Sequence, residues 1–100
     1  MDDDQHLLAR IDERLRAAQA DLTLLRREFE TFAQRIERDE ETVLDPYGAQ
    51  AEEEFFAVAS EAFFVHPQAM QREHPDLYGM FVRFYRQDPA AETAAPRVRP

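Results

Sequence analysis

Apolar side chains recur at alternating intervals of three and four residues through the first third of the chain. This spacing forms one apolar stripe along an α-helix, and neither Gly nor Pro interrupts it. Acidic and arginine side chains fill most of the intervening positions, which indicates a solvated opposite face. The stripe consists of Leu8, Ile11, Leu15, Ala18, Leu22, Leu25, Phe29, Phe32 and Ile36. We therefore assign residues 1–41 to one long amphipathic helix and its flanks.

Three shorter helices are expected after a connector at residues 39–48. Proline cannot continue a helix but fits the first helical turn, so Pro67, Pro75 and Pro89 predict boundaries between elements. The chain after Pro89 contains little to bury, and we expect a flexible tail over residues 90–100. The three expected helices cover residues 51–65, 68–73 and 75–86.

The pattern as a whole predicts an all-α domain. No segment shows the period-two alternation of a half-buried strand. The helix at 51–65 leaves few positions for water, so we expect it to be more buried than the first helix. The long amphipathic helix should pack on the three shorter helices of the segment 42–89. The expected core contains Phe55, Phe56, Ala59, Phe63, Phe64, Leu77, Phe81 and Phe84.

Composition excludes several classes of partner and site. The 100 residues include 21 acidic and 12 basic side chains, for a formal net charge of −9. This balance argues against binding to nucleic acid or to an anionic membrane surface, because both need a basic patch. Cysteine is absent, which excludes disulfides and thiolate metal sites. No apolar run approaches the roughly 20 residues of a membrane helix, and no secretory signal pattern is present, so we expect a cytoplasmic protein.

One stretch of the sequence resembles a known family. It begins with Asp45-Pro46-Tyr47-Gly48-Ala49 and continues through a helix that reads Glu54-Phe55-Phe56-Ala57-Val58-Ala59-Ser60-Glu61-Ala62-Phe63-Phe64. The likeness extends through Pro67, Pro75-Asp76-Leu77-Tyr78 and Phe84-Tyr85-Arg86-Gln87-Asp88-Pro89, and spans residues 42–89. This set of motifs resembles the C-terminal part of the Mlc titration factor A family of zinc-dependent peptidases.

The resemblance implies roles for three residues. In such peptidases two histidines of a His-Glu-x-x-His helix bind zinc, and a glutamate from a later helix is the third ligand. By resemblance, Glu54 takes the position of that glutamate, and Tyr47 matches a tyrosine that donates to the substrate or the oxyanion. Glu61, two helical turns after Glu54, would support a zinc-binding histidine. Without the resemblance, Glu54 would be an ordinary glutamate of a first helical turn and Tyr47 a turn aromatic.

The sequence departs from the family at the other zinc ligands. It contains no His-Glu-x-x-His, and none of its histidines, His6, His66 and His74, lies four residues from another. A catalytic zinc needs three protein ligands, so one carboxylate is insufficient. We therefore expect a partial zinc-dependent metallopeptidase domain that is inactive as an isolated chain, with a complementing peptidase segment as its partner. His66 and His74 each precede a proline and are expected to be cap or surface residues.

A second hypothesis from another class is a non-catalytic helical interaction module. The stripe over residues 8–36 fits the heptad pattern of a coiled coil, which would form a homodimer. In a parallel pair, Asp21 would face Arg26 of the second copy, and Arg35 would face Glu40. The alternative is that the stripe packs on the Phe-rich shorter helices of the same chain.

Overall fold

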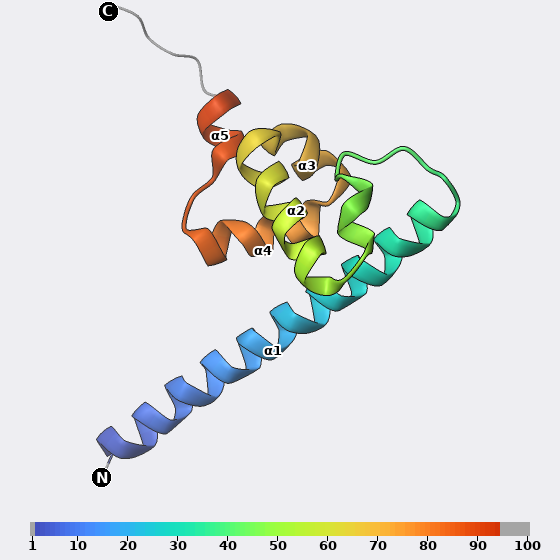
Figure 1. Cartoon of the computed structure of the whole chain (residues 1–100). Helices are drawn as coiled ribbons and strands as arrows, with labels where there is room; N and C mark the ends of the chain where they lie inside the picture. The colour runs from blue at the N-terminus through green and yellow to red at the C-terminus, as the bar shows by residue number, and fades with distance from the viewer. Residues whose placement is uncertain (1, 95–100) are drawn as a thin grey trace, which may run out of the picture.

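The computed structural model describes residues 2–94, and this part of the chain is all-α, as the sequence predicts (Figure 1). No strand occurs among the described residues. In the same part of the chain, no helix is both long and apolar enough to cross a membrane. The elements are α1 (Asp2–Glu37), the 3₁₀ helix η1 (Pro46–Ala49), α2 (Glu52–Val65), α3 (Pro67–Glu73), α4 (Pro75–Tyr85) and α5 (Pro89–Ala94).

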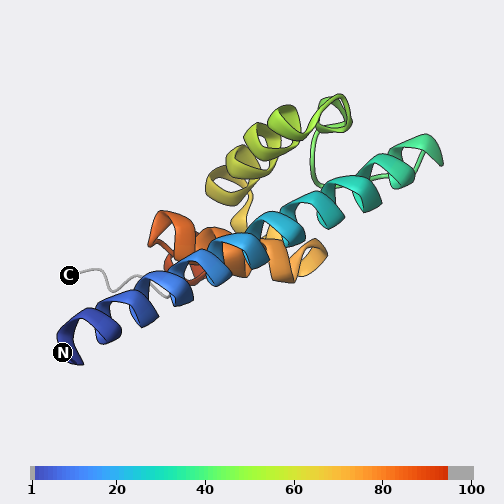
Figure 2. The same ribbon diagram turned by 90° about the horizontal axis from the view of Figure 1, so that it is seen from below.

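Helix α1 is one continuous rod, and only its second half packs on the other elements (Figure 2). Residues 3–20 are all exposed, whereas Phe32 is buried and Leu25, Phe29 and Ile36 pack against the core. The first half therefore extends beyond the rest of the domain, and the molecule is 57 Å along its longest axis but 17 Å along its shortest. The prediction that this stripe packs within the chain is thus correct for the second half of α1 only.

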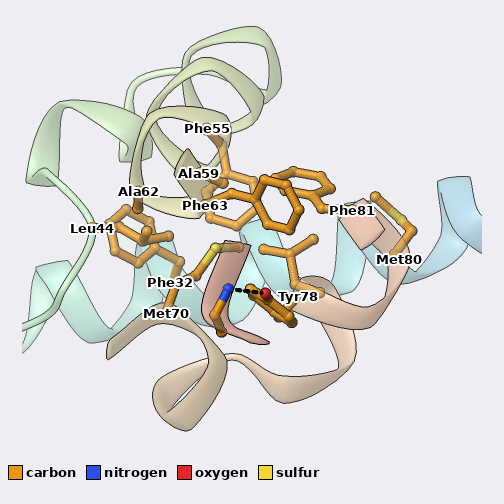
Figure 3. Close-up of a cluster of buried hydrophobic side chains, with 12 residues drawn as sticks. Phe32, Leu44, Phe55, Ala59, Ala62, Phe63, Met70, Tyr78, Met80 and Phe81 are labelled. Atoms are coloured by element: carbon orange, nitrogen blue, oxygen red, sulfur yellow. Dashed lines mark hydrogen bonds between the residues drawn. The ribbon is translucent and has the colours of Figure 1, made fainter. Parts of the chain in front are cut away.

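The core is formed where α2 and α4 meet the second half of α1 (Figure 3). Several aromatic rings contact one another edge to face: Phe63 lies 5.7 Å from Phe81, and Phe29 lies 5.7 Å from Phe55, between ring centroids. Such pairs add specific geometry to the apolar area that they bury. The buried apolar residues are Phe32, Leu44, Phe55, Ala59, Ala62, Phe63, Met70, Leu77, Tyr78, Met80, Phe81 and Ala90.

Three aromatic residues of the expected core lie at or near the surface. Phe84 is 63% exposed and Phe64 is 43% exposed, so the prediction that they are core residues is wrong. Phe56 is half-buried and covers Phe81 from outside, at a centroid distance of 5.4 Å. Phe56 and Phe64 belong to α2 and Phe84 to α4, and their side chains lie at the edge of the covered faces of these helices among the described residues.

A short helix, α5, begins at Pro89, next to the expected tail. The flexible tail is predicted from Ala90, but Ala90 is 3% exposed and belongs to α5. The hydroxyl group of Tyr78 donates a 2.6 Å hydrogen bond to Asp88 Oδ1 and accepts a 2.8 Å bond from the backbone N–H of Ala90. Burial and the bond to Asp88 raise the pKa of Tyr78. The first described residues of the expected tail are therefore helical, and residues 95–100 lie outside the described part of the chain.

Proline marks the starts of the short helices, as expected for Pro67 and Pro75, whereas the sequence predicts only that Pro89 ends the preceding helix. Pro67, Pro75 and Pro89 each occupy the first position of a helix, where a missing N–H costs no intrahelical hydrogen bond. His66 and His74 are the residues between consecutive helices, so their predicted position at helix boundaries is confirmed. The observed bounds of α2, α3 and α4 differ from the expected bounds by at most one residue.

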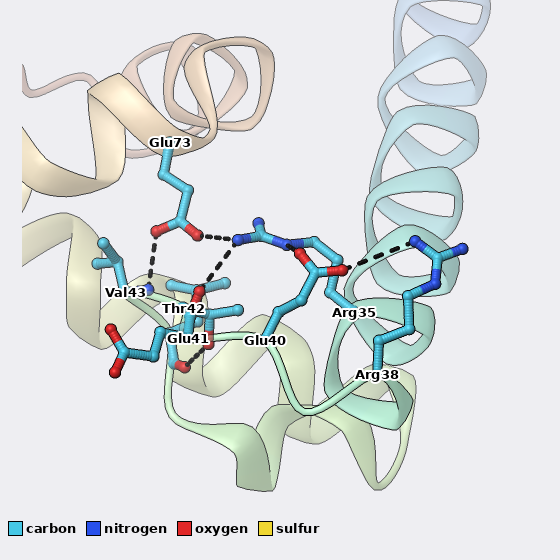
Figure 4. A network of polar contacts seen from close by, with 8 residues as sticks. Arg35, Arg38, Glu40, Glu41, Thr42, Val43 and Glu73 are labelled. Atoms are coloured by element: carbon cyan, nitrogen blue, oxygen red, sulfur yellow. Dashed lines mark hydrogen bonds and ion pairs between the residues drawn. The ribbon is translucent and has the colours of Figure 1, made fainter.

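The connector between α1 and η1 is held by an ion-pair network (Figure 4). One carboxylate oxygen of Glu73 pairs with Arg35 at 2.7 Å, and the other accepts a 2.7 Å hydrogen bond from the backbone N–H of Val43. Arg35 also donates to the carbonyl of Glu41 and pairs with Glu40 at 3.3 Å. Glu73 thus joins the end of α3 to α1 and to the segment that leads into η1.

Gly48 allows η1 to dock closely against α1 and α2. A Cβ added at Gly48 would lie 3.3 Å from Val58 Cβ and 3.4 Å from both Phe32 Cε2 and Phe55 Cα. These separations are at or below the lower limit of ordinary van der Waals contact, and one of them is to backbone. Gly48 has no positive φ, so the requirement is for space and not for backbone conformation.

We expect Gly48→Ala to destabilise the domain by about 1–3 kcal/mol, because the added methyl group must displace packed neighbours. Gly79→Ala is the matched control, since a Cβ there meets only the end of Arg83 at 3.9 Å within the helix α4. That control should be neutral or up to about 1 kcal/mol stabilising, because Ala is the better helix former. Urea unfolding of both variants measures the difference, and equal midpoints would contradict the close approach.

Candidate functional site

A short capped turn orients Tyr47. The side chain of Asp45 accepts a 2.9 Å hydrogen bond from the backbone N–H of Tyr47, and its carbonyl accepts one of 2.9 Å from Gly48. Asp45 is the N-cap of η1, and Pro46 occupies the first position. The Tyr47 side chain is 55% exposed, so its phenol group is presented to solvent from a well-defined backbone.

Glu54 lies close to this turn in the first turn of α2. Three consecutive glutamates begin the helix, where its dipole favours negative charge. Glu52 pairs with Arg26 of α1 at 3.8 Å, Glu53 is exposed, and Glu54 is half-buried. Within the described part of the chain, no side chain caps the start of α2.

The docking of Gly48 brings the segments of Tyr47 and Glu54 together. Gly48 follows Tyr47 in sequence and packs directly on Phe55, which follows Glu54. The backbone at Gly48 is therefore adjacent to that at Phe55, and the preceding residues, Tyr47 and Glu54, are exposed and half-buried, respectively. The sequence predicts that the turn aims Tyr47 toward the same region as Glu54, and the structure brings the two backbone segments together there.

Glu61 lies on the exposed side of α2, two turns beyond Glu54. It lines a surface groove of about 280 Å³ together with Asp45 and His66. A carboxylate on an apolar helix needs a partner only where it is buried, and Glu61 is exposed to solvent. The other lining residues come from the connector, η1 and α2: Thr42, Val43, Leu44, Pro46, Val58 and Ala62.

The histidines are spread over the molecule. His6 lies on the exposed half of α1 and His66 is exposed at the end of α2. His74 is 5% exposed, and its Nε2 atom has no hydrogen-bond partner within the described residues. Burial lowers the pKa of His74, so its imidazole is neutral at neutral pH.

These residues do not by themselves fit a zinc ion. Among residues 3–92, no three His, Cys, Asp or Glu side chains are grouped closely enough to bind a metal. Glu54 supplies one carboxylate, whereas zinc in proteins takes three or four protein ligands. No step that depends on a bound metal can therefore be assigned to this chain alone.

The sequence pattern identifies Asp45 only as part of a turn and misses its hydrogen bond to Tyr47. The signal is present, since Asp directly before Pro is a typical N-cap followed by the first helical residue. The pattern also misses the link between Arg35 and Glu73, because the two residues are far apart in sequence. The spacing of residues within a short segment cannot predict an ion pair between distant segments.

The described residues form an all-α domain in which an acidic helix start lies beside a turn that carries an exposed tyrosine. The family of glucose-regulated metallo-peptidases M90 matches residues 11–86, which is more than half of the chain, and the protein belongs to this family. No solved structure matches the chain.

Curated relatives match a shorter stretch. Mlc titration factor A of Pectobacterium atrosepticum is 50% identical over 48 residues, which are 48% of this chain and 18% of the relative. Mlc titration factor A of Edwardsiella ictaluri is 48% identical over 46 residues, which are 46% of this chain and 18% of that protein. An uncharacterised protein of Synechocystis is 39% identical over 62 residues, 62% of this chain and 22% of its own length. The chain spans about a fifth of the length of the curated relatives it matches.

Proposed function

We propose that this chain contributes the carboxylate side of a zinc metallopeptidase site and is inactive until another segment supplies the His-Glu-x-x-His. The observation that carries the proposal is the close docking of η1 on α2 at Gly48. It brings the backbone of Tyr47 near that of Glu54, with both side chains accessible from outside. Membership of the metallo-peptidase family supports the choice of chemistry.

Glu54 is the proposed metal ligand. A carboxylate oxygen binds zinc at about 2.0–2.2 Å, and catalytic sites commonly combine it with two imidazoles. Its half-buried position at the helix start restricts the side chain more than that of the exposed Glu53. A zinc ion bound by Glu54 and two added histidines would supply a Lewis acid and an activated water.

Tyr47 is the proposed donor to the substrate. A phenol O–H placed beside a metal centre can donate a hydrogen bond to negative charge that develops on a carbonyl oxygen. Asp45 holds the backbone of Tyr47 through its side-chain hydrogen bond, so the phenol group starts from a restricted position. Glu61 is proposed to orient one of the added histidines by accepting its second ring N–H.

The experiment compares the isolated chain with a chimera. In the chimera, residues 42–89 replace the matching stretch of a family member that carries His-Glu-x-x-His. Calorimetric titration should show weak, non-stoichiometric zinc binding to the isolated chain and one zinc per chimera. Hydrolysis of a chromogenic peptide should be absent for the isolated chain and EDTA-sensitive for the chimera.

Two results would contradict the proposal. Tight stoichiometric zinc binding or EDTA-sensitive cleavage by the isolated chain would show that it needs no other segment. A chimera that is folded by circular dichroism but binds no zinc would show that residues 42–89 cannot complete the site.

A further inference from the structure

His74 is a buried titratable residue at the corner between α3 and α4. It is 5% exposed, and the Nε2 atom of its imidazole has no hydrogen-bond partner among the described residues. Its backbone is fixed on both sides, because its N–H donates to the carbonyl of Met70 at 2.7 Å and its carbonyl accepts from the N–H of Tyr78 at 2.8 Å. No loop adjoins the ring, so a charged imidazole reaches water only if the corner between the two helices opens.

The backbone of such a corner does not by itself require a buried imidazole. His66 lies at the corner between α2 and α3, also directly before a proline. Its backbone angles, φ −129° and ψ 57°, are close to the −132° and 65° of His74. His66 is nevertheless exposed. The two histidines therefore share a backbone setting and differ in burial, which makes His66 a matched control for His74.

The residue before His74 holds the connector between α1 and η1 (Figure 4). The Oε1 atom of Glu73 pairs with Arg35, and its Oε2 atom accepts a hydrogen bond from the backbone N–H of Val43, each at 2.7 Å. Both carboxylate oxygens are therefore engaged in holding the connector. A movement of the α3–α4 corner that displaces Glu73 breaks these two bonds and frees the connector.

We propose that His74 is an acid-sensitive latch: protonation of its imidazole opens the α3–α4 corner and releases the connector that Glu73 holds. A protonated imidazole carries a positive charge and two N–H donors, and a buried charge or donor without a partner is costly. The open form gives the charged ring access to water, so protons shift the equilibrium toward it. The inference uses no residue of the metallopeptidase proposal, so either can fail alone.

The charges around His74 do not compensate for its burial. Burial has the largest influence and lowers the pKa of His74, while Glu73 on α3 raises that pKa and Arg35 on α1 lowers it. Among the described residues, the charged groups of α2, α4 and α5 have no such effect. Because the pKa is lower in the closed form, the open form binds the proton more readily. The closed form is therefore fully favoured above the ordinary histidine pKa of about 6.5 and loses that advantage as the pH falls below it.

Glu28 has a shifted pKa as well, but its effect has the opposite sign. It lies on α1, and burial together with the nearby charge of Asp76 on α4 raises its pKa. A carboxyl group whose pKa is higher in the folded state binds protons more strongly there, so acidification through its titration stabilises the closed form. Release of the connector on acidification is therefore a property of His74 and not of Glu28.

Amide hydrogen exchange of the full chain, followed by NMR, tests the release. In wild type, the protection factor of the Val43 N–H should fall about tenfold between about pH 7.5 and pH 5.5, because one proton is bound per opening event below the ordinary histidine pKa. The N–H of Phe63, within the buried helix α2, should remain more strongly protected than that of Val43 at both pH values, since it exchanges only when the core opens.

Two variants assign the effect to one imidazole. His74→Gln removes the group that binds the proton and should abolish the pH dependence of Val43 protection, whereas His66→Gln should leave it unchanged. The comparison of Val43 with Phe63 in wild type does not depend on folding of the His74 variant. A Val43 protection factor that does not change with pH, or that changes equally in His74→Gln, would overturn the proposal. Equal protection of Val43 and Phe63 at the lower pH would overturn it too, because the whole domain would then be unfolding.

Discussion

Glu54→Ala in the chimera is expected to weaken zinc binding by more than about 100-fold, which is the upper limit for loss of a residue that only supports a ligand. The reason is ligand count: two histidines remain, and a catalytic zinc is normally held by three protein side chains. Hydrolysis should fall to background in step with the metal content. Calorimetric titration and metal analysis of the purified chimera measure the effect.

Glu53→Ala is the control for this experiment. Glu53 has the same charge and lies in the same helical turn, but it is exposed, so zinc affinity should not change. Tyr47→Phe separates metal binding from chemistry: zinc should stay bound while kcat falls by about 100-fold, the loss typical of one removed transition-state donor. Equal zinc affinities for Glu53→Ala and Glu54→Ala would remove Glu54 from the metal site.

Phe63→Ala is expected to cost about 3–5 kcal/mol of unfolding free energy, a large share of the roughly 5–15 kcal/mol typical of a domain. The side chain of Phe63 is fully buried, and its ring contacts those of Tyr78, Phe81 and Tyr85 at centroid distances of 5.0, 5.7 and 5.6 Å. Its removal leaves a cavity that several helices would have to collapse to fill. Thermal or urea unfolding of the full chain measures the loss.

Phe84→Ala makes the same chemical change at an exposed position. Phe84 contacts Phe56 and Tyr85 at ring edges, at centroid distances of 5.8 and 4.9 Å, so its removal should cost about 1 kcal/mol. The two variants together test whether burial, and not aromatic content, sets the cost. If Phe84→Ala proved as costly as Phe63→Ala, the outer aromatic residues would belong to the core after all.

Local sequence patterns were sufficient for helices α1 to α4, but they predict neither η1 nor α5. The period of the apolar residues and the absence of Gly and Pro predict the long first helix, although the observed helix starts earlier, at Asp2. Proline predicts the starts of α3 and α4 because its ring excludes it from a helix interior. The dense apolar content of residues 51–65 correctly predicts a helix more buried than the first. The motif from Asp45 to Glu61 was sufficient to indicate the family, because it is a continuous run of the chain.

Burial of individual side chains required the tertiary structure. Phe63 and Phe64 are adjacent and chemically identical, yet one is fully buried and the other is 43% exposed, because α4 covers only one side of α2. The stripe on α1 has one uniform pattern from Leu8 to Ile36, but only its second half meets other helices. Periodicity reports which face of a helix is apolar and not how far a partner extends along it.

For the candidate site, too, the contribution of the sequence can be separated from that of the tertiary structure. The resemblance of the sequence to the family makes Tyr47 and Glu54 candidates for the chemistry, and the sequence itself shows that no pair of histidines accompanies them at ligand spacing. Only the tertiary structure decided that Gly48 packs on Phe55 and so brings those two residues near each other. It alone also showed that Glu73 ties the connector to Arg35, since contacts between distant segments depend on how the helices pack and leave no mark on local spacing.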